Sequence, residues 1–397
     1  MERIWTYCRP LEDRIIRWRR DLHRIPEIGT QLPKTQAYVT ACLDEMGIPY
    51  RKGARDSGVI ADIEGGLPGK RVAFRADMDA LEIGEETGLP FASKHPGRMH
   101  ACGHDAHTAM LLGAGKVLWE HRDRLRGNVR LIFQTAEEGV AGARIAIADG
   151  CLDGVDAVFG THIGTLMGTE IPSGKILISR GCCMASGDHF TITVRGAGCH
   201  GSSPEKGVDP VHIAAHVLLA LEGIQARETS ALEPAVVTIG RIHGGDANNV
   251  IPDTVLMGGT IRALDRGVRD RVALRMREIA EGTALALGGS AFMELTQSVP
   301  PVVNDPGMAD LAARAAREVA GDTNVEGDRT RPCMGSEDFS LYLEQVPGCF
   351  LFLSSADPAK GTNVSHHSAR FNVDESVLWE GSAVFAAIAE RFLNGEE

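Results

Sequence analysis

The chain has 397 residues, of which 43% are hydrophobic and 24% are charged, so it is long enough for two domains with buried cores. Lys and Arg number 41 against 53 Asp and Glu, and the resulting formal charge of -12 argues against a nucleic-acid or anionic-membrane partner. The first ten residues are too polar for a secretory signal, and no apolar run is long enough to span a bilayer, so we expect a cytoplasmic protein. Nine cysteines without a repeating spacing are more typical of buried thiols or a metal ligand than of a disulfide framework.

The first half of the chain alternates between predicted helices and strands. Apolar spacing predicts two amphipathic helices between residues 10 and 46, and a further helix over 105–121. The predicted strands are 71–76, 129–134 and 155–160. This alternation is typical of a parallel sheet in an α/β fold, in which ligands bind beyond the carboxyl ends of the strands. The acidic and histidine side chains that follow these strands are Asp79, Glu137, Glu138 and His162.

The pattern changes near residue 187 to the β-α-β-β-α-β order of a split ferredoxin-like unit. The predicted elements there are strands 189–194, 235–242, 254–263 and 290–296 and helices 210–226 and 269–287. We therefore predict an inserted α+β domain over 187–299, within an α/β catalytic domain formed by residues 1–186 and 300–397. A helix over 308–320, a strand over 349–353 and a helix over 375–393 complete the predicted catalytic domain.

Groups that bind metals or carry protons are concentrated in residues 99–107. Cys102 and His104 lie there, and the downstream pairs Glu137–Glu138 and His366–His367 extend the set together with His162. A two-metal hydrolytic site needs nitrogen and sulfur ligands, a carboxylate ligand and one unliganded base. If the two glutamates lie in extended backbone, one points to the metal and its neighbour to the water. Each pair alone is more typical of a solvated surface, but their joint placement at strand ends favours one site.

Several sequence blocks together resemble a known family. They are 75–81 (RADMDAL), 100–114 (HACGHDAHTAMLLGA), 134–139 (QTAEEG), 249–253 (NVIPD) and 259–262 (GTIR). The chain resembles the metallo-amidohydrolases, which include hippurate hydrolases, bacterial aminoacylases and plant auxin-conjugate hydrolases and are similar to carboxypeptidase G and other co-catalytic zinc peptidases. The resemblance runs nearly end to end. It implies a zinc-peptidase-like catalytic domain, an inserted ferredoxin-like lid and dimerisation domain, and a homodimer.

The resemblance also implies roles for individual residues. The implied metal ligands are Cys102, His104, Glu138, His162 and His367, with Cys102 bridging two ions. Glu137 is implied as the general base on metal-bound water and as the acid that returns the proton to the leaving amine. His200 is implied to stabilise the oxyanion, often from the partner subunit, while Asn249 and Arg262 hold the substrate's carboxylate. A structural turn role for His200 and a strand-surface role for Arg262 stay open as alternatives.

The chain departs from the family in loops that line the mouth of the site in relatives. The departures are residues 163–168, Ser354–Ser355 and Ala369, which stands where a proline is expected. The preferred acyl group and amino acid therefore do not follow from the resemblance. Of the two adjacent histidines we take His367 as the ligand, because residues 371–375 then align with the family's following segment.

These observations predict an amidohydrolase that cleaves N-acyl or N-aroyl amino acids to a carboxylic acid and a free amino acid. Two divalent cations are expected as cofactors, with manganese or zinc first and cobalt or nickel also compatible with the ligands. The expected partners are a small N-acyl amino acid and a second copy of the chain. A dipeptidase or aminopeptidase with the same metal site is the alternative. A non-catalytic metal-binding protein is disfavoured, because every ligand position and the base are filled.

Overall fold

The computed structural model describes residues 2–327 and 331–396. The chain divides into two compact units. The first comprises Met1–Cys183, Val302–Cys333 and Asp338–Glu397, and the second comprises Met184–Pro301 and Met334–Glu337. The short segment 334–337 therefore packs with the second unit, although it lies in the sequence range that we assigned to the catalytic domain. Each unit has its own hydrophobic core.

The first unit is built on an eight-stranded sheet with the order β1-β2-β4-β3-β5-β16-β6-β15. The strands are β1 (Tyr50–Lys52), β2 (Val59–Glu64), β3 (Leu67–Asp77), β4 (Arg126–Gln134), β5 (Ala157–Gly164), β6 (Ile176–Leu177), β15 (Val325–Glu326) and β16 (Gly348–Ser354). The central strands β4, β3, β5 and β16 are parallel, as predicted. The complete sheet is mixed, because β2 runs antiparallel to β4, β1 to β2, and β6 to β16.

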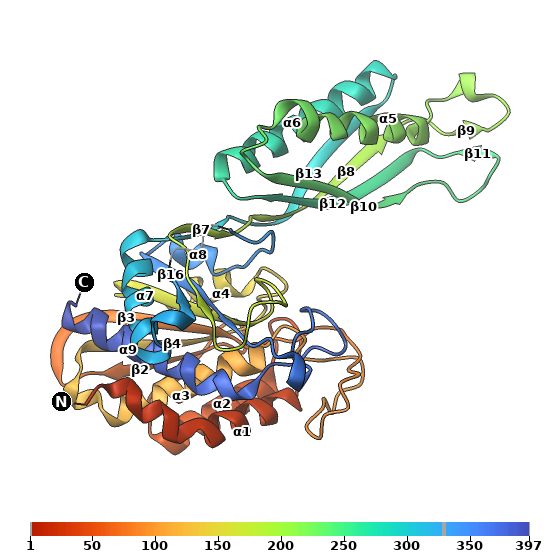
Figure 1. Cartoon of the computed structure of the whole chain (residues 1–397). Helices are drawn as coiled ribbons and strands as arrows, with labels where there is room; N and C mark the ends of the chain where they lie inside the picture. Colours follow the sequence, from red (N-terminus) through yellow and green to blue (C-terminus); the bar gives the residue numbers. More distant parts are fainter. Residues whose placement is uncertain (1, 328–330, 397) are drawn as a thin grey trace. The chain divides into compact units, whose positions relative to one another are not determined.

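Helices pack around this sheet, and one of them begins at His104, inside the segment 99–107. They are α1 (Glu12–His23), α2 (Pro33–Met46), α3 (His104–Glu120), α4 (Gly142–Ala148), α7 (Pro306–Ala320), α8 (Ser340–Leu343) and α9 (Leu378–Asn394), with a 3-10 helix η1 (Ile4–Leu11) before α1. The helix α3 contacts α1, α9 and the sheet, and nearly all of its residues are buried (Figure 1). A small pair, β7 (Gly181–Met184) and β14 (Val302–Asn304), forms a separate two-stranded sheet.

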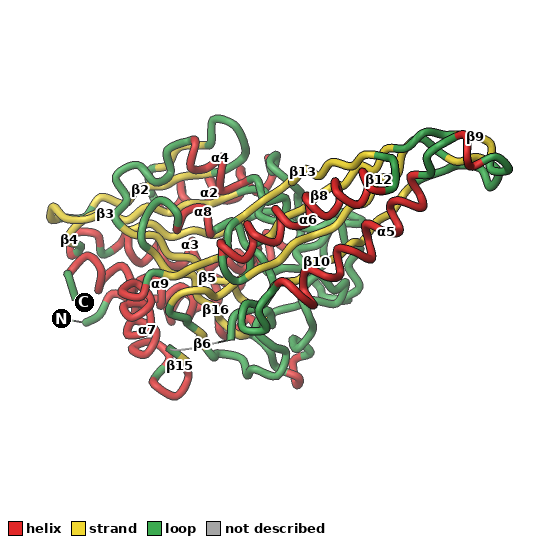
Figure 2. The backbone as a smooth tube through the Cα atoms, turned by 90° about the horizontal axis from the view of Figure 1, so that it is seen from above, coloured by secondary structure: helices red, strands yellow, loops and turns green. Residues whose placement is uncertain are grey.

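The second unit has the predicted β-α-β-β-α-β order. Its antiparallel sheet runs β10-β12-β8-β13, and two helices cover one face of it (Figures 1 and 2). The elements are β8 (Gly187–Arg195), α5 (Pro210–Gly223), β10 (Ala235–His243), β12 (Thr254–Ala263), α6 (Arg266–Ala286) and β13 (Ser290–Val299). Val255, Met257 and Met293 are buried in the core of this unit, whereas Leu256 and Phe292 alternate with them and are exposed. A second small pair, β9 (Cys199–His200) and β11 (Val250–Ile251), belongs to the same unit.

The other expectations from composition concern cysteines and membrane spans. All nine cysteines are free thiols, in agreement with the absence of a disulfide framework expected from their spacing. Across residues 2–327 and 331–396, the helices are too short or too polar to traverse a bilayer.

Candidate metal centre

The predicted metal ligands of the first unit are carried by four separate segments. Cys102 lies in the loop before α3, and His104 is the first residue of that helix. Glu138 follows β4, and His367 lies in the long loop between β16 and α9. His162 was expected just beyond its strand, but β5 continues to Gly164, so His162 is part of the strand. Because β4, β3, β5 and β16 are parallel, their carboxyl ends meet at one edge of the sheet.

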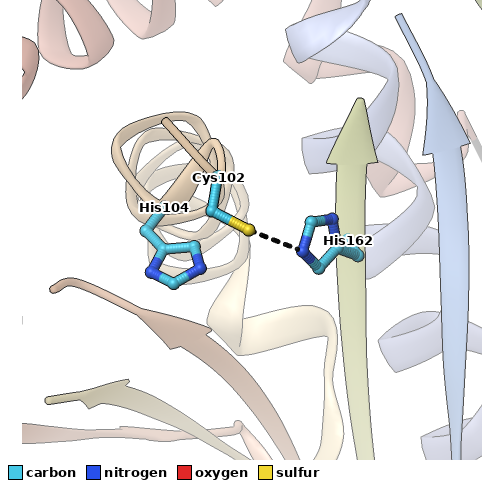
Figure 3. Close-up of side chains that lie close together, drawn as sticks. All are labelled: Cys102, His104 and His162. Carbon is cyan, nitrogen blue, oxygen red and sulfur yellow. Dashed lines mark hydrogen bonds between the residues drawn. The ribbon is translucent and has the colours of Figure 1, made fainter. Parts of the chain in front are cut away.

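Two groups of potential ligands share the sulfur of Cys102. One group is Cys102, His104 and His162, and the other is Cys102, Glu138 and His367. Within each group the ligand atoms lie within 4.8 Å of one another. The Cys102 Sγ atom is 3.4 Å from His162 Nε2, and the two side chains point toward each other from the loop and from β5 (Figure 3). The structure thus brings all five predicted ligands together in an arrangement that suits a bridging thiolate.

The backbone partners of two histidines leave a nitrogen lone pair facing this centre. His104 Nδ1 donates to the carbonyl oxygen of Asp79 at 2.9 Å, and His162 Nδ1 donates to that of Ile163 at 2.9 Å. The proton of each neutral ring is then on Nδ1, and Nε2 is free to bind a metal. His104 Nε2 is buried and makes no hydrogen bond to the described residues, and Glu138 Oε1 has His367 Nε2 as its ion-pair partner at 3.3 Å. Sulfur, imidazole and carboxylate donors around the unsatisfied His104 Nε2 fit a divalent cation of borderline softness.

His107, close to these ligands, is excluded from metal binding by its own hydrogen bonds. Its Nδ1 lies 2.6 Å from Asp77 Oδ1, and its Nε2 accepts the N–H of Ile163 at 2.8 Å. Both ring nitrogens are therefore occupied. Asp77 is paired in turn with the buried Arg75 at 2.8 Å, and Arg75 with Asp338 at the same distance. Sequence reasoning did not assign Asp77 or Asp338, and nothing in the pattern around residue 338 indicates its role.

The two adjacent glutamates lie in a tight turn and not in extended backbone, so the sequence argument for their opposite orientation was wrong. Both carboxylates come within 4.8 Å of His104, and Glu137 Oε2 is 4.0 Å from His104 Nε2. The turn is held by Asp79, whose two carboxylate oxygens accept the N–H groups of Glu137 at 3.0 Å and Glu138 at 3.2 Å. Asp79 was noted from the sequence as lying at a strand end, but this positioning role was not predicted.

Backbone strain is concentrated around the same side chains. Within the described part of the chain, the non-glycine residues with positive φ are Ala136 (49°), Val140 (52°) and His367 (61°). The first two flank the glutamate turn, and the third is a predicted ligand, held by a hydrogen bond from its N–H to the carbonyl oxygen of Ala101 at 2.9 Å. Left-handed backbone is unfavourable for residues other than glycine and is frequent at functional sites.

The surroundings shift the pKa values of the candidate ligands in different directions. Burial raises the pKa of the Cys102 thiol, and the Glu138 carboxylate adds to this effect. Interaction with Cys102 and Glu138 raises the pKa of His367 to about 10, and His367 Nε2 lies 3.3 Å from Glu138 Oε1. Burial lowers the pKa of His162 well below its usual value. A divalent cation would displace protons from Cys102 and His367, because thiolate and neutral imidazole are the forms that bind metals.

The three predicted residues of the second unit fall into two places. His200 lies on β9 and pairs with Val250, and the neighbouring Asn249 accepts the N–H of Gly201 through its carbonyl at 2.7 Å. Arg262 is near the carboxyl end of β12, where it is partly buried and hydrogen-bonded to Ser336. The whole length of β12 therefore separates Arg262 from the other two residues.

Comparison with known proteins identifies the family. The model of peptidase family M20/M25/M40 matches residues 73–391, which include every predicted ligand and the candidate base. The chain belongs to this family. The resemblance to metallo-amidohydrolases and the expected fold are thereby confirmed, and the chain is a hydrolase of an enzyme family that acts on amide bonds.

Members of the M20 family with similar sequences carry different activities in their names. The chain is 41% identical to an N-acetyl-L-cysteine deacetylase of Bacillus subtilis, over 98% of this chain and 90% of that protein. It is 39% identical to thermostable carboxypeptidase 1 of Saccharolobus solfataricus, over 99% of both chains. A solved structure of the Bacillus subtilis YXEP protein, described as a dinuclear metal-binding peptidase of the M20 family, has a TM-score of 0.81 and 37% identity, and covers 97% of this chain and 99% of that one.

Proposed function

We propose that this M20 chain is a two-metal amidohydrolase that cleaves N-acyl or N-aroyl amino acids to a carboxylic acid and a free amino acid. The observation that carries the proposal is the pair of ligand groups sharing Cys102, with the carboxylate of Glu137 next to one of them. The ligands suit manganese or zinc, and cobalt or nickel are also compatible. The dinuclear metal site named for the YXEP relative supports the number of ions.

Glu137 is the residue that moves protons in this proposal. Two divalent cations bound by Cys102, His104, Glu138, His162 and His367 would supply Lewis acidity at the amide carbonyl and acidify a water molecule. Glu137 accepts the proton of the attacking water and returns it to the nitrogen of the leaving amino acid. Its backbone N–H is anchored on Asp79, which fixes the position of the carboxylate near His104. The breaking bond is the amide C–N bond, and the products are a carboxylate and a free amine.

Recognition of the substrate is assigned to the second unit. Arg262 and Asn249 hold the carboxylate of the amino-acid part, a task for which a guanidinium is well suited. His200 stabilises the oxyanion that forms during attack. Arg262 and the His200–Asn249 pair are separated by the residues 254–262 of β12, which span roughly 25 Å in a strand. Since one metal centre is much smaller than this, the proposal requires that the two groups come from different chains.

A homodimer supplies this second chain. The edge strand β10 has an unpaired side within its sheet, and the exposed apolar residues Val236 and Ile242 lie on it. On helix α5, which packs against the neighbouring strand β12, the side chains of Val211 and Leu219 are also exposed. Unpaired edges and exposed apolar side chains are typical of surfaces that associate with another chain. These features support the predicted dimer through the second unit, in which residues of one copy serve the centre of the other.

The test measures amino-acid release from N-acetyl, N-benzoyl and indoleacetyl amino acids and from dipeptides. Chelator-treated protein is assayed with and without added manganese or zinc, and we expect metal-restored release from one acyl class. Glu137→Gln should retain both ions and lose roughly 100- to 10,000-fold in turnover, because the isosteric amide cannot accept the proton. Full activity of this variant with metal bound would contradict the mechanism.

A peptidase that recognises a free amine or a peptide carboxylate is the second candidate. The specific observation in its favour is the 39% identity to a protein named thermostable carboxypeptidase 1. Release from peptides alone in the same assay would assign the chain to this class. Silence toward all substrates with metal bound would contradict both candidates.

A further inference from the structure

A further imidazole, that of His366, faces the sulfur of Cys102. Its Nδ1 lies 3.5 Å from Cys102 Sγ, nearly the same distance as His162 Nε2 at 3.4 Å. The two rings are neighbours, with centroids 5.0 Å apart and planes inclined at 66°. Two histidines thus approach one sulfur, and the question is whether they play the same role.

Hydrogen bonds to the backbone determine which nitrogen carries the proton in the imidazoles of His366 and His162. The N–H of Thr165 donates to His366 Nε2 at 2.9 Å, so this nitrogen carries no proton. The ring proton of His366 is therefore on Nδ1, the atom that faces the sulfur. In His162 the proton is on Nδ1 as well, but there it is donated to the Ile163 carbonyl, and the unprotonated Nε2 faces the sulfur. The sulfur meets a lone pair from His162 and an N–H group from His366.

The ring of His366 is held in this orientation from several sides. A Cβ atom on Gly164 would lie 2.4 Å from His366 Nε2, so the ring fills the space that the glycine leaves. The buried Phe371 ring lies against it, with centroids 4.5 Å apart. The hydroxyl of Thr165 donates to the carbonyl of Val364 at 2.9 Å and ties the two loops together. The N–H of His366 therefore has little freedom to turn away from Cys102.

We propose that His366 is a positioning residue that donates its Nδ1–H to the thiolate of Cys102 and so orients and partly neutralises the sulfur that the two ligand groups share. This inference rests on the metal centre of the proposed function. A protonated Nδ1 cannot bind a metal, so His366 supports the ligands and His367 next to it remains the ligand. An N–H group directed at a bridging thiolate withdraws electron density from it and fixes its direction, and partners of this kind contribute to metal affinity.

The experiment replaces the native metal with cobalt(II) and follows the sulfur-to-cobalt charge-transfer absorption during titration of the metal-free protein. In His366→Leu the donor is lost at similar volume, and we expect the band to move to longer wavelength and cobalt affinity to fall roughly 10- to 100-fold. In His366→Asn the amide N–H occupies nearly the position of Nδ1–H, and we expect band and affinity to return toward those of the unsubstituted protein. His121→Leu, the same change at the residue after the carboxyl end of α3, is the control and should leave the band unchanged.

The outcomes separate this inference from the function on which it rests. A band that is identical in the unsubstituted protein and in His366→Leu overturns the role of His366 but leaves the metal centre in place. Absence of the band from the unsubstituted protein, as in a Cys102→Ser control, overturns the thiolate-bridged centre and the inference with it. Circular dichroism checks folding of each variant. If His366→Leu does not fold, His366→Gln takes its place, because its amide reaches Thr165 and leaves no donor beside the sulfur.

Discussion

Asp79 connects several parts of the candidate metal centre. Its carboxylate accepts the N–H groups of Glu137 and Glu138, and its carbonyl accepts Nδ1–H of His104. Asp79→Asn replaces one of the two carboxylate oxygens by an NH2 group. This group cannot accept a hydrogen bond from the backbone N–H of Glu137 or Glu138, so the turn loses one of its two bonds to residue 79. We expect metal affinity to fall roughly 10- to 100-fold in chelator competition. Asp322→Asn, at a mostly exposed carboxylate, is the control and should bind metal like the unsubstituted protein. Equal affinity of the two variants would contradict this role.

Glu380, in the first turn of α9, gives stability a pH dependence that is separate from the metal centre. Burial raises its pKa to about 7, with Arg9 opposing and Asp374 adding repulsion. The folded state binds this proton more tightly than the unfolded state, so the carboxylate destabilises the fold increasingly as pH rises from 4.5 to 7 and by a constant amount above it.

Glu380→Gln removes this ionisation at nearly constant shape. Above pH 7 the variant should be more stable than the unsubstituted protein by roughly 1–2 kcal/mol, less than the full value of the pKa shift because the carboxylate is partly exposed. Below pH 4.5 the two proteins should have the same stability. The measurement is thermal or urea unfolding of both proteins across this pH range, and a difference that does not vary with pH would count against the buried carboxylate.

At single residues, the sequence was sufficient to predict which side chains are candidate metal ligands or proton carriers, but not which groups they hydrogen-bond to. Cys102, His104 and the paired glutamates stand out because their side chains bind metals or carry protons within short motifs. Asp338 lies about 200 residues from its partners Gln134 and Ala143, and a lone aspartate carries no signal of such contacts. The role of His366 depends on which nitrogen accepts the Thr165 N–H, and this appears only when the two loops are in contact.

The turn between β4 and α4 is the element on which the candidate base depends, and the glycine that begins α4 after this turn has no space for a side chain. A Cβ atom on Gly142 would lie 1.5 Å from the carbonyl oxygen of Thr135, a backbone atom that cannot move without displacing the turn. Gly142→Ala should destabilise the fold by about 2–4 kcal/mol and displace Glu137 and Glu138. We expect a lower melting temperature together with loss of bound metal.

Gly139→Ala in the same turn is the matched control. The nearest atom to its added Cβ would be the Ala136 carbonyl oxygen at 3.9 Å, which is an ordinary contact. Its melting temperature and metal content should stay close to those of the unsubstituted protein. If both variants behave alike, the close approach at residue 142 does not determine the geometry of the turn.

Among the elements, long buried strands and helices were predictable and short edge elements were not. The central strands β4, β5 and β16 are apolar runs between turn residues, which is a strong pattern. The edge strand β1 has three residues and β6 has two, too few for a period to be recognised. The glutamates follow a strand, so extended backbone was the natural expectation. The strand ends at Gln134, and the positive φ of Ala136 begins a turn that the residue type does not indicate.

At the scale of the whole molecule, the candidate residues are divided between two units. The ligands and Glu137 belong to the first unit, and His200, Asn249 and Arg262 to the second. The change from α/β alternation to the split ferredoxin-like order made this division visible in the sequence. In the proposed dimer, which copy of the second unit would serve which candidate metal centre is a matter of assembly, and the order of residues along one chain carries no information about it. The length of β12 between His200 and Arg262 makes the question testable.

Mixing two inactive variants distinguishes action within one chain from action across a dimer. Glu137→Gln lacks the proposed base and His200→Ala lacks the proposed oxyanion donor, and each variant alone should be nearly inactive. After random exchange of subunits about half of the dimers are mixed, and each of these has one centre with an intact Glu137 that faces the intact His200 of the other chain.

If His200 acts across the dimer, the mixture should recover about a quarter of the unsubstituted activity, because half of the dimers carry one working centre of two. If His200 acts within its own chain, no mixed dimer contains a complete centre and activity stays at the level of the separate variants. Mixing unsubstituted protein with Glu137→Gln keeps the number of working centres constant and so controls for activity lost during exchange. Size-exclusion chromatography of tagged chains measures the fraction of mixed dimers. Absence of recovery with proven exchange would contradict the two-chain centre, and with it the assignment of His200 and Arg262 to different copies.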